Sequence, residues 1–309
     1  MVLICGDPLE VVTAFLCSRL KMFRIDHRIL DLRTASDAVS MDWSWRDGRA
    51  LGSMSTADWK LQFDELTGVY FRNVWPAPGD YEESETDVYP AYPRTDPRIA
   101  TVLNSVPCRV VNRPAAIYSN RSKPFQALII RRFGFEIPRT LITNDPEVAK
   151  RFYEECEGKV ISKLISGVRS IVRRVNKDDL GGVASVEHGL TQLQEYVPGD
   201  NIRVHVIGEH LFPVRIQSQA VDYRYAAQEG YARTMAPAKL PEHVENNCIR
   251  LTREFDLTMS GIDLKETPTG EYYCFEVNTS PAFPFYESPA RPVVADALGQ
   301  FLAQREEQP

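Results

Sequence analysis

Three oxygen-bearing side chains near the C-terminus have the types and spacing of a metal site. Asp263 lies in the apolar stretch 260–264, and Glu276 and Asn278 are two residues apart in the stretch 272–280. Side chains two apart in a strand point to the same face of the sheet. Carboxylate and amide oxygens suit Mg²⁺ bound together with substrate phosphates. We expect a magnesium site here; the alternative is that both carboxylates pair with arginines on a solvent face.

Two lysines are candidates for contact with phosphate. Lys123 opens a predicted helix, and Lys163 lies inside the apolar segment 160–165. Because burying an ammonium group without a partner is costly, a lysine in the middle of a strand is unusual. This pattern favours Lys163 as a phosphate or nucleotide ligand. The alternative is a wet strand face along which Lys159 and Lys163 both extend to solvent.

The segment 193–200 has the character of a hinge that could recognise a nucleotide. A short strand, 193–197, ends in the sequence Pro-Gly-Asp at 198–200. Exposed backbone groups and the carboxylate of Glu195 could there contact a planar base and a ribose.

The segments that position these side chains alternate between strands and helices, which indicates an α/β fold. Predicted strands are 2–5, 27–32, 69–72, 109–111, 135–142, 159–164, 191–196, 203–207, 211–219 and 272–277. Predicted helices are 9–20, 96–105, 121–132, 146–156 and 241–255. Residues 42–55 predict a hairpin. Segment 73–96, with four prolines among several acids, predicts a long loop, and Gly181-Gly182 predicts a second one.

Composition and charge narrow the class of protein. The 309 residues carry a formal net charge of −6, with 43% hydrophobic and 25% charged residues, which is ordinary for a globular protein. A net negative charge gives no indication of a nucleic-acid-binding surface, for which an excess or a stripe of basic residues would be expected. The six cysteines show no C-x-x-C pair or zinc spacing, and no signal peptide or apolar membrane span is present. We therefore expect a cytoplasmic protein without a nucleic-acid or membrane partner.

The order of the motifs is more specific than any one of them. They are Lys123, Lys163, Gln194-Glu195-Tyr196, Asn201-Ile202-Arg203, Asp222-Tyr223-Arg224, Gly261-Ile262-Asp263 and Glu276-Val277-Asn278-Thr279-Ser280-Pro281. Together they resemble the RimK-like ligases of the ATP-grasp superfamily. The resemblance implies an N-terminal Rossmann-like pre-ATP-grasp domain (1–114), a central α+β domain (115–190) and a C-terminal α+β domain (191–309).

The same resemblance implies ATP and Mg²⁺ as cofactors and assigns a role to each motif. Lys123 and Lys163 correspond to the lysines that contact nucleotide phosphates. The remaining nucleotide-binding residues it implies are Gln194, Glu195, Tyr196, Val197 and Asn201. The arginines it implies as catalytic, facing the phosphates or an acyl phosphate, are Arg203, Arg215 and Arg224. Asp263, Glu276 and Asn278 correspond to the magnesium ligands.

A narrower resemblance, to the microviridin-type or graspetide peptide-maturing enzymes, is carried by further motifs. They are the segments 68–72, 111–114, 120–126, 134–146 and 214–219 leading to Asp222 and Arg224. It implies that the partner is a ribosomal precursor peptide with a leader and a core. It is also compatible with a homodimer. The Asp or Glu side chains of that peptide would be activated as acyl phosphates and joined as esters or amides to Ser, Thr or Lys.

Two other functions stay open. The same chemistry could act on free amino acids or on a protein or peptide C-terminus, or a non-catalytic protein could only hold nucleotide or peptide. The intact set of Asp263, Glu276 and Asn278 favours an enzyme.

One segment departs from the family pattern. Where RimK-like chains carry a glycine-rich flap, residues 166–174 hold one glycine and three arginines. We expect Arg169 or Ser170 to contact phosphate there, whereas Arg173 and Arg174 equally suit a solvated edge.

Overall fold

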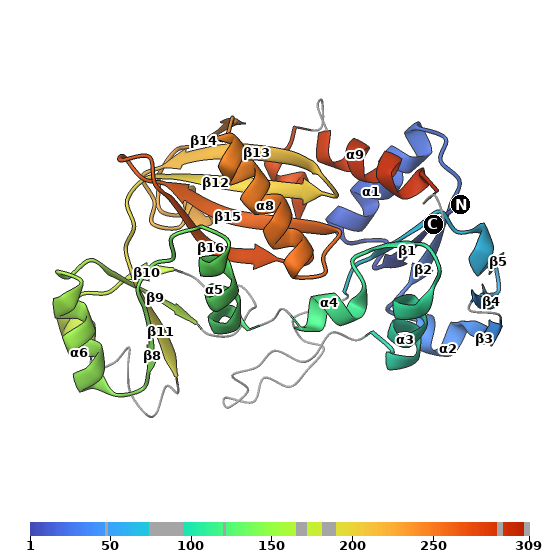
Figure 1. The fold of residues 1–309 in the computed structure, drawn as a ribbon, viewed down its shortest axis with the longest axis horizontal. Helices are drawn as coiled ribbons and strands as arrows, with labels where there is room; N and C mark the ends of the chain where they lie inside the picture. The colour runs from blue at the N-terminus through green and yellow to red at the C-terminus, as the bar shows by residue number, and fades with distance from the viewer. Residues whose placement is uncertain are drawn as a thin grey trace.

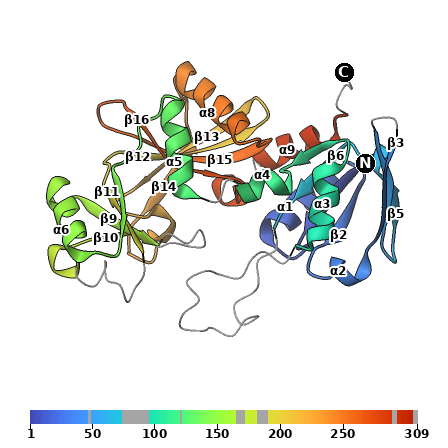
Figure 2. The ribbon, with the colours of Figure 1, turned by 60° about the horizontal axis from the view of Figure 1, so that its bottom comes forward.

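The computed structural model of the chain describes residues 1–46, 49–73, 95–119, 122–164, 172–180, 190–288 and 293–305. Its described strands form four sheets. Figure 1 shows a parallel sheet near both chain ends, the largest sheet in the middle and a small sheet with α6 at the opposite end, and Figure 2 shows the same order from another side. The predicted α/β class is confirmed.

The first sheet is parallel, with strand order β2-β1-β6-β7. Its strands are β1 (Val2–Gly6), β2 (His27–Asp31), β6 (Gly68–Phe71) and β7 (Arg109–Val111). Because side chains alternate along a strand, Leu3 and Cys5 enter one core, whereas Val2 and Ile4 enter a second core on the other face.

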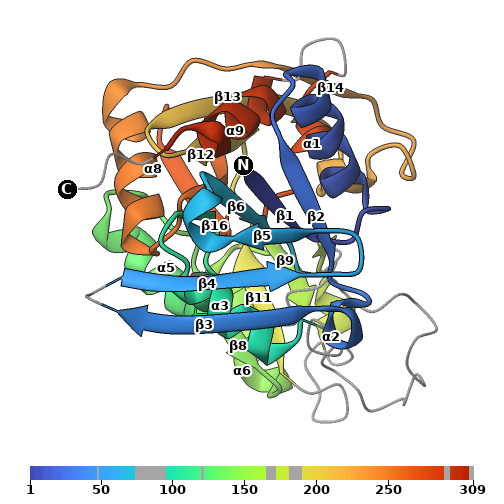
Figure 3. The same ribbon diagram turned by 90° about the vertical axis from the view of Figure 1, so that its right-hand side faces the viewer.

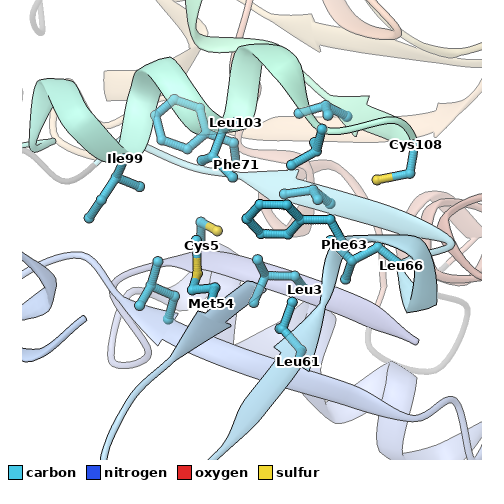
Figure 4. Packing of buried hydrophobic residues seen from close by; sticks show 14 of the residues in the cluster. Leu3, Cys5, Met54, Leu61, Phe63, Leu66, Phe71, Ile99, Leu103 and Cys108 are labelled. Atoms are coloured by element: carbon cyan, nitrogen blue, oxygen red, sulfur yellow. The ribbon is translucent and has the colours of Figure 1, made fainter. Parts of the chain in front are cut away.

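The first core lies between the parallel sheet, α3 (Pro97–Ser105) and a three-stranded antiparallel sheet. That sheet contains β3 (Ser40–Arg46), β4 (Arg49–Ser55) and β5 (Lys60–Gln62), so the predicted hairpin is confirmed. Figure 3 shows β3, β4 and β5 as an outer layer beside the parallel strands. Figure 4 shows the side chains that converge in this core, including Met54 and Leu61 from the outer sheet and Ile99 and Leu103 from α3.

The second core is built by α1 (Val11–Met22) and α9 (Val293–Ala303), which lie side by side. Helix α1 begins later than predicted because the side chain of Glu10 accepts hydrogen bonds from the backbone N–H of Val12 and Thr13, which makes Glu10 the N-cap. The sequence analysis did not predict α9. Its buried residues Val294, Leu298 and Leu302 join Ile207 and Met259 of the largest sheet in this core, so the last helix connects the two sheets.

The largest sheet is antiparallel, with order β14-β13-β12-β15-β16. Its strands are β12 (Asp200–Ile207), β13 (His210–Ser218), β14 (Arg233–Pro237), β15 (Met259–Glu266) and β16 (Tyr272–Asn278). The helices α5 (Lys123–Arg132) and α8 (Glu242–Glu254) cover one face, where Ile202, Val204 and Ile262 are buried in the third core. Alternation therefore places Arg203 and Asp263 on the opposite face.

The small sheet has order β10-β9-β11-β8. Its strands are β8 (Thr140–Thr143), β9 (Val160–Leu164), β10 (Arg173–Arg174) and β11 (Thr191–Glu195). Helix α6 (Pro146–Glu155) packs on it. Asp145 caps α6 by accepting hydrogen bonds from the backbone N–H of Glu147 and Val148.

Further differences from the sequence analysis are local. It did not predict β5, β14, the short helix α2 (Ala35–Ala38) or α4 (Pro114–Ser119). Most of the predicted loop 73–96, the Gly181-Gly182 loop and the flap residues Arg169 and Ser170 lie outside the described residues. Across the described ranges, no helix is long and apolar enough to cross a membrane. The domain limits 1–114, 115–190 and 191–309 stay a prediction.

Candidate active site

The three predicted metal ligands lie on one face of the largest sheet. The antiparallel register places Asp263 opposite Glu276 and Gly261 opposite Asn278. The amide of Asn278 donates a hydrogen bond from Nδ2 to Oδ2 of Asp263 at 3.1 Å. Within the described ranges no three His, Cys, Asp or Glu side chains group into a metal site. Two carboxylates and one amide offer oxygen donors, which suit a hard divalent cation whose remaining ligands would be phosphate oxygens and water.

Arg203 lies beside these acids on the same face. Its Nη1 donates to Oδ1 of Asp263 at 2.6 Å, and its side chain is 5% exposed. Burial acts to lower the pKa of Arg203, but the neighbouring carboxylate of Asp263 and two phenols outweigh burial, so the pKa is raised and the cation is retained. Asp263 thus has the arginine partner of the alternative interpretation, while about a third of its side chain stays exposed for a further ligand.

The two predicted lysines approach the acids from other elements. Lys123, at the first turn of α5, places Nζ 3.6 Å from Oε2 of Glu276. Lys163 on β9 donates to Oε1 of Gln194 at 2.9 Å, and Gln194 donates in turn to Oγ1 of Thr140. Gln194 therefore orients Lys163 from within the small sheet.

The charge on Lys163 is weakened by its surroundings. Burial is the main cause that lowers the pKa of Lys163 to about 8; the carboxylates of Glu276 and Asp263 act to raise it, and the cations of Lys123 and Arg224 act to lower it. Nζ also lies 5.2 Å from the centre of the Phe275 ring. A lysine whose ammonium group is only just retained near neutral pH gains most from the arrival of an anion.

The hinge segment connects the small sheet to the largest sheet. Nε of Arg139 donates to the carboxylate of Glu195 at 2.6 Å, and the backbone N–H of Tyr196 donates to the carbonyl of Lys159. The carbonyl of Val197 accepts from Nζ of Lys265 at 3.0 Å. Burial lowers the pKa of Lys265 to about 8. The sequence analysis did not single out Lys265.

Arg224 faces the site from the turn η4 (Tyr223–Tyr225). Its guanidinium group binds both carboxylate oxygens of the buried Asp222. The adjacent Tyr223 shares a hydrogen bond of 3.0 Å with Tyr286, and burial raises the pKa of Tyr223. Tyr286 also lies under the guanidinium of Arg203, at 5.2 Å from its ring centre.

Arg215 is the predicted site residue that the fold does not bring to this cluster. It pairs with Ile202 in the register and extends on the face that carries α8, where it binds Asp200 at 2.9 Å and also Glu266. Asn201 lies on the same face as Arg203, opposite Lys265. Arg174 places its guanidinium 4.6 Å from the centre of the Tyr196 ring, although its side chain is exposed.

Gln126 was missed as a site residue. It is buried on α5, where its Nε2 donates to the carbonyl of Val277 at 2.9 Å and its Oε1 accepts from the N–H of Val277 at 3.0 Å. It thus holds the residue between Glu276 and Asn278. The available signal was a polar residue on the apolar helix face shared with Ile129 and Ile130.

Comparison with known proteins gives a consistent result. The chain is 24% identical over 202 residues to a protein of Saccharophagus degradans named "Probable alpha-L-glutamate ligase", covering 62% of this chain and 66% of that one. Its fold is similar to that of the macrocyclase MdnC of Microcystis aeruginosa bound with precursor peptide MdnA, with TM-score 0.76, 22% identity and coverage of 98% and 99% of the two chains.

It is also similar to the ATP-grasp ligase PsnB complexed with a phosphomimetic variant of its minimal precursor, Mg and ADP. Here the TM-score is 0.74, with 22% identity and 97% of each chain covered. At these identities the likeness shows a shared fold along nearly the whole chain.

The family is shown by the sequence itself. The RimK-like ATP-grasp domain family matches residues 119–295, which is more than half of the chain and includes every predicted site residue. The predicted resemblance is confirmed: the chain belongs to the RimK-like ATP-grasp family.

Proposed function

We propose that the protein is an ATP-dependent ligase that activates carboxylates of a ribosomal precursor peptide and joins them to hydroxyl or amino groups. The observation that carries this proposal is that Asp263, Glu276 and Asn278 share one sheet face, with Lys123 3.6 Å from Glu276 and Lys163 near enough to Glu276 and Asp263 for their charges to affect its pKa. Family membership and the folds of the peptide-bound ligases support it.

ATP would be bound by both sheets. Lys163, oriented by Gln194, and Lys123, held near Glu276, are placed to neutralise phosphate oxygens. The hinge at Glu195, with Tyr196 and Val197, is the proposed site for the base and ribose. Asn201, on the same sheet face as Arg203, would complete the nucleotide contacts.

Asp263, Glu276 and Asn278 would hold Mg²⁺, which when bound neutralises phosphate charge and aligns the transferred phosphoryl group. The donor set fits this ion because all three side chains offer oxygen from one face. The chain's own task is then to hold the carboxylate of the peptide in line with the γ-phosphate and to exclude water.

The reaction would proceed through an acyl phosphate. An oxygen of the peptide carboxylate attacks the γ-phosphorus, and ADP leaves with the electrons of the broken P–O bond. A hydroxyl or amine then attacks the acyl carbon, phosphate leaves, and the proton of the nucleophile is released. Arg203 and Arg224 are placed to stabilise the negative charge that develops on the acyl oxygen during this second attack.

Arg215 has a structural role in this proposal. Its ion pairs with Asp200 and Glu266 are on the opposite face of the sheet from Asp263. We assign it to holding β12, β13 and β15 together.

A second function is favoured by one observation, the similarity to the protein named as a glutamate ligase. In that case the same site would join free amino acids or add them to a protein or peptide C-terminus.

A cytoplasmic location and a homodimer are part of the main proposal.

The test combines mass spectrometry with ADP release. We expect a precursor peptide encoded beside the gene, rich in Thr, Ser, Asp and Glu, to lose one water per bond formed on co-expression. Glu276→Gln should abolish the modification and peptide-dependent ADP release. Glu266→Gln, which removes a carboxylate on the other face, should retain both. An unmodified precursor with active dipeptide synthesis would support the second function, and ADP binding without either reaction would indicate a non-catalytic protein.

A further inference from the structure

Arg72 connects the parallel sheet to the loop that follows the metal strand. It lies directly after β6, and its Nη1 donates to the carbonyl of Ser280 at 2.8 Å and to Oγ of Ser280 at 3.1 Å. Its Nη2 lies 2.9 Å from Oε1 of Glu10, the N-cap of α1. The side chain is only 15% exposed. One guanidinium group therefore joins β6, α1 and the loop after β16.

Asn112 makes a second connection to the same loop. It follows β7 and is buried, and its Nδ2 donates to the carbonyls of Met259 at 2.6 Å and Thr279 at 2.7 Å. Its Oδ1 accepts from the N–H of Thr258 at 2.8 Å and of Met259 at 2.9 Å. Both donors and both acceptor positions of the amide are thus used. Asn112 joins the start of β15 to the end of β16.

Both residues hold the loop directly after a proposed metal ligand, Asn278. Strands β6 and β7 are parallel neighbours, so the residues after them lie at the same edge of the sheet. From there Arg72 and Asn112 hold the residues that immediately follow Asn278, while Gln126 holds Val277 immediately before it. The main chain of Asn278 is therefore restrained on both sides by side-chain hydrogen bonds to its neighbours.

We propose that Arg72 and Asn112 are positioning residues through which the N-terminal parallel sheet sets the affinity of the metal site. This inference rests on the proposed metal role of Asp263, Glu276 and Asn278. Groups that orient metal ligands from outside the coordination shell change metal affinity by about 10–100-fold when they are removed. A purely structural role would lower the melting temperature and leave metal affinity unchanged.

The test uses Mn²⁺ in place of Mg²⁺, measured by electron paramagnetic resonance titration of the full chain with ADP. We expect Arg72→Met to raise the Kd for Mn²⁺ by at least about tenfold. Arg19→Met is the matched control, because Arg19 is also 15% exposed and pairs with Asp296 at 2.6 Å to join α1 to α9. Its Kd should stay within about twofold of the wild type, whatever happens to its melting temperature.

Milder variants cover the event that Arg72→Met does not fold. Arg72→Lys keeps the pairing with Glu10 but offers fewer donors to Ser280, and Ser280→Ala removes only the hydroxyl acceptor. We expect each to raise the Kd for Mn²⁺ several-fold, with Arg72→Lys above Ser280→Ala. Unchanged Mn²⁺ affinity in folded Arg72→Met, or in both milder variants, overturns the inference.

The failure of the proposed function has a different signature. If the wild type does not bind Mn²⁺ with ADP, or if Glu276→Gln binds it as tightly as the wild type, the metal site itself is wrong and the inference fails with it. If Glu276→Gln loses Mn²⁺ while Arg72→Met keeps it, only the role of Arg72 is wrong.

Discussion

The two sides of the proposed phosphate site are built by different physical means. On the acid side, Asp263 and Glu276 remain 33% and 31% exposed, and their positions depend on hydrogen bonds to β16 and its loop. On the lysine side, Lys163 donates a hydrogen bond to Gln194 and lies near the Phe275 ring, and burial lowers its pKa to about 8. The acid side thus depends on geometry, and the lysine side depends on desolvation.

The hydrophobic cores that support the two sides also differ in extent. The largest sheet is backed by α8 and α5 over an extended apolar cluster, whereas the small sheet shares its core mainly with α6. This difference indicates that the acids form the fixed part of the site, and that the lysine side contributes a charge that responds to its surroundings. The predictions below separate geometry from charge, from the largest expected effect to the smallest.

Removing one carboxylate of the acid side should have the largest effect on activity. We expect Asp263→Asn to lower kcat/KM for ATP by about 10³-fold, because it removes a proposed metal ligand and the counter-charge of Arg203. Peptide-dependent ADP release measures this effect. Asp200→Asn, which lies on the opposite face beside Arg215, is the control and should retain activity. Wild-type turnover by folded Asp263→Asn would exclude the acid side from the reaction.

A variant that removes hydrogen bonds to β16 without removing a charge should test the positioning of the acids alone. Gln126→Leu leaves the N–H and carbonyl of Val277 without their side-chain partner, so Glu276 and Asn278 lose a restraint. We expect the Mg²⁺ concentration for half-maximal ADP release to rise by about 10–100-fold. Gln217→Leu, which removes an exposed glutamine from β13, should leave it unchanged. Equal effects of the two variants would contradict the comparison.

Titrating the lysine side should change its charge without changing any residue. Lys163 is protonated below its pKa of about 8 and attracts phosphate there; above that pH the attraction is lost. We expect kcat/KM for ATP to fall about tenfold between pH 7 and pH 9, because this parameter reports the free enzyme. Lys163→Arg should abolish this fall in kcat/KM between pH 7 and pH 9. The pKa of Lys265 is also about 8, so Lys265→Met is the control and should retain the fall in kcat/KM.

The hinge should give the smallest effect. Lys265→Met removes the donor to the carbonyl of Val197, a hydrogen bond with a net contribution of about 1 kcal/mol. We expect KM for ATP to rise about fivefold with little change in kcat, because the variant affects nucleotide binding and not phosphoryl transfer. Steady-state kinetics beside the exposed control Lys239→Met measure it. A fall in kcat at constant KM would place Lys265 in the chemistry instead.

The sequence indicated the site residues that depend on local patterns. Glu276 and Asn278 share a face because strand side chains alternate, and Lys163 stood out because it interrupts an apolar run. The family resemblance grouped Arg215 with Arg203, but strand alternation places Arg215 on the other face, which carries α8.

The residues that sequence reasoning missed act over long separations. Gln126 meets Val277, Asn112 meets Thr279 and Arg72 meets Ser280, each more than a hundred positions along the chain. Such pairs leave no periodic signal, because neither partner specifies the other locally.

The sequence by itself determined the α/β class and the family and singled out the proposed oxygen ligands with their lysines, because strand alternation and motif order are properties of neighbouring residues. Only the tertiary structure decided which side chains share a face of the largest sheet, how the loop after β16 is held from the parallel sheet, and how far burial lowers the pKa of Lys163. Those outcomes depend on burial and on contacts between distant segments, and both arise only when the sheets pack together.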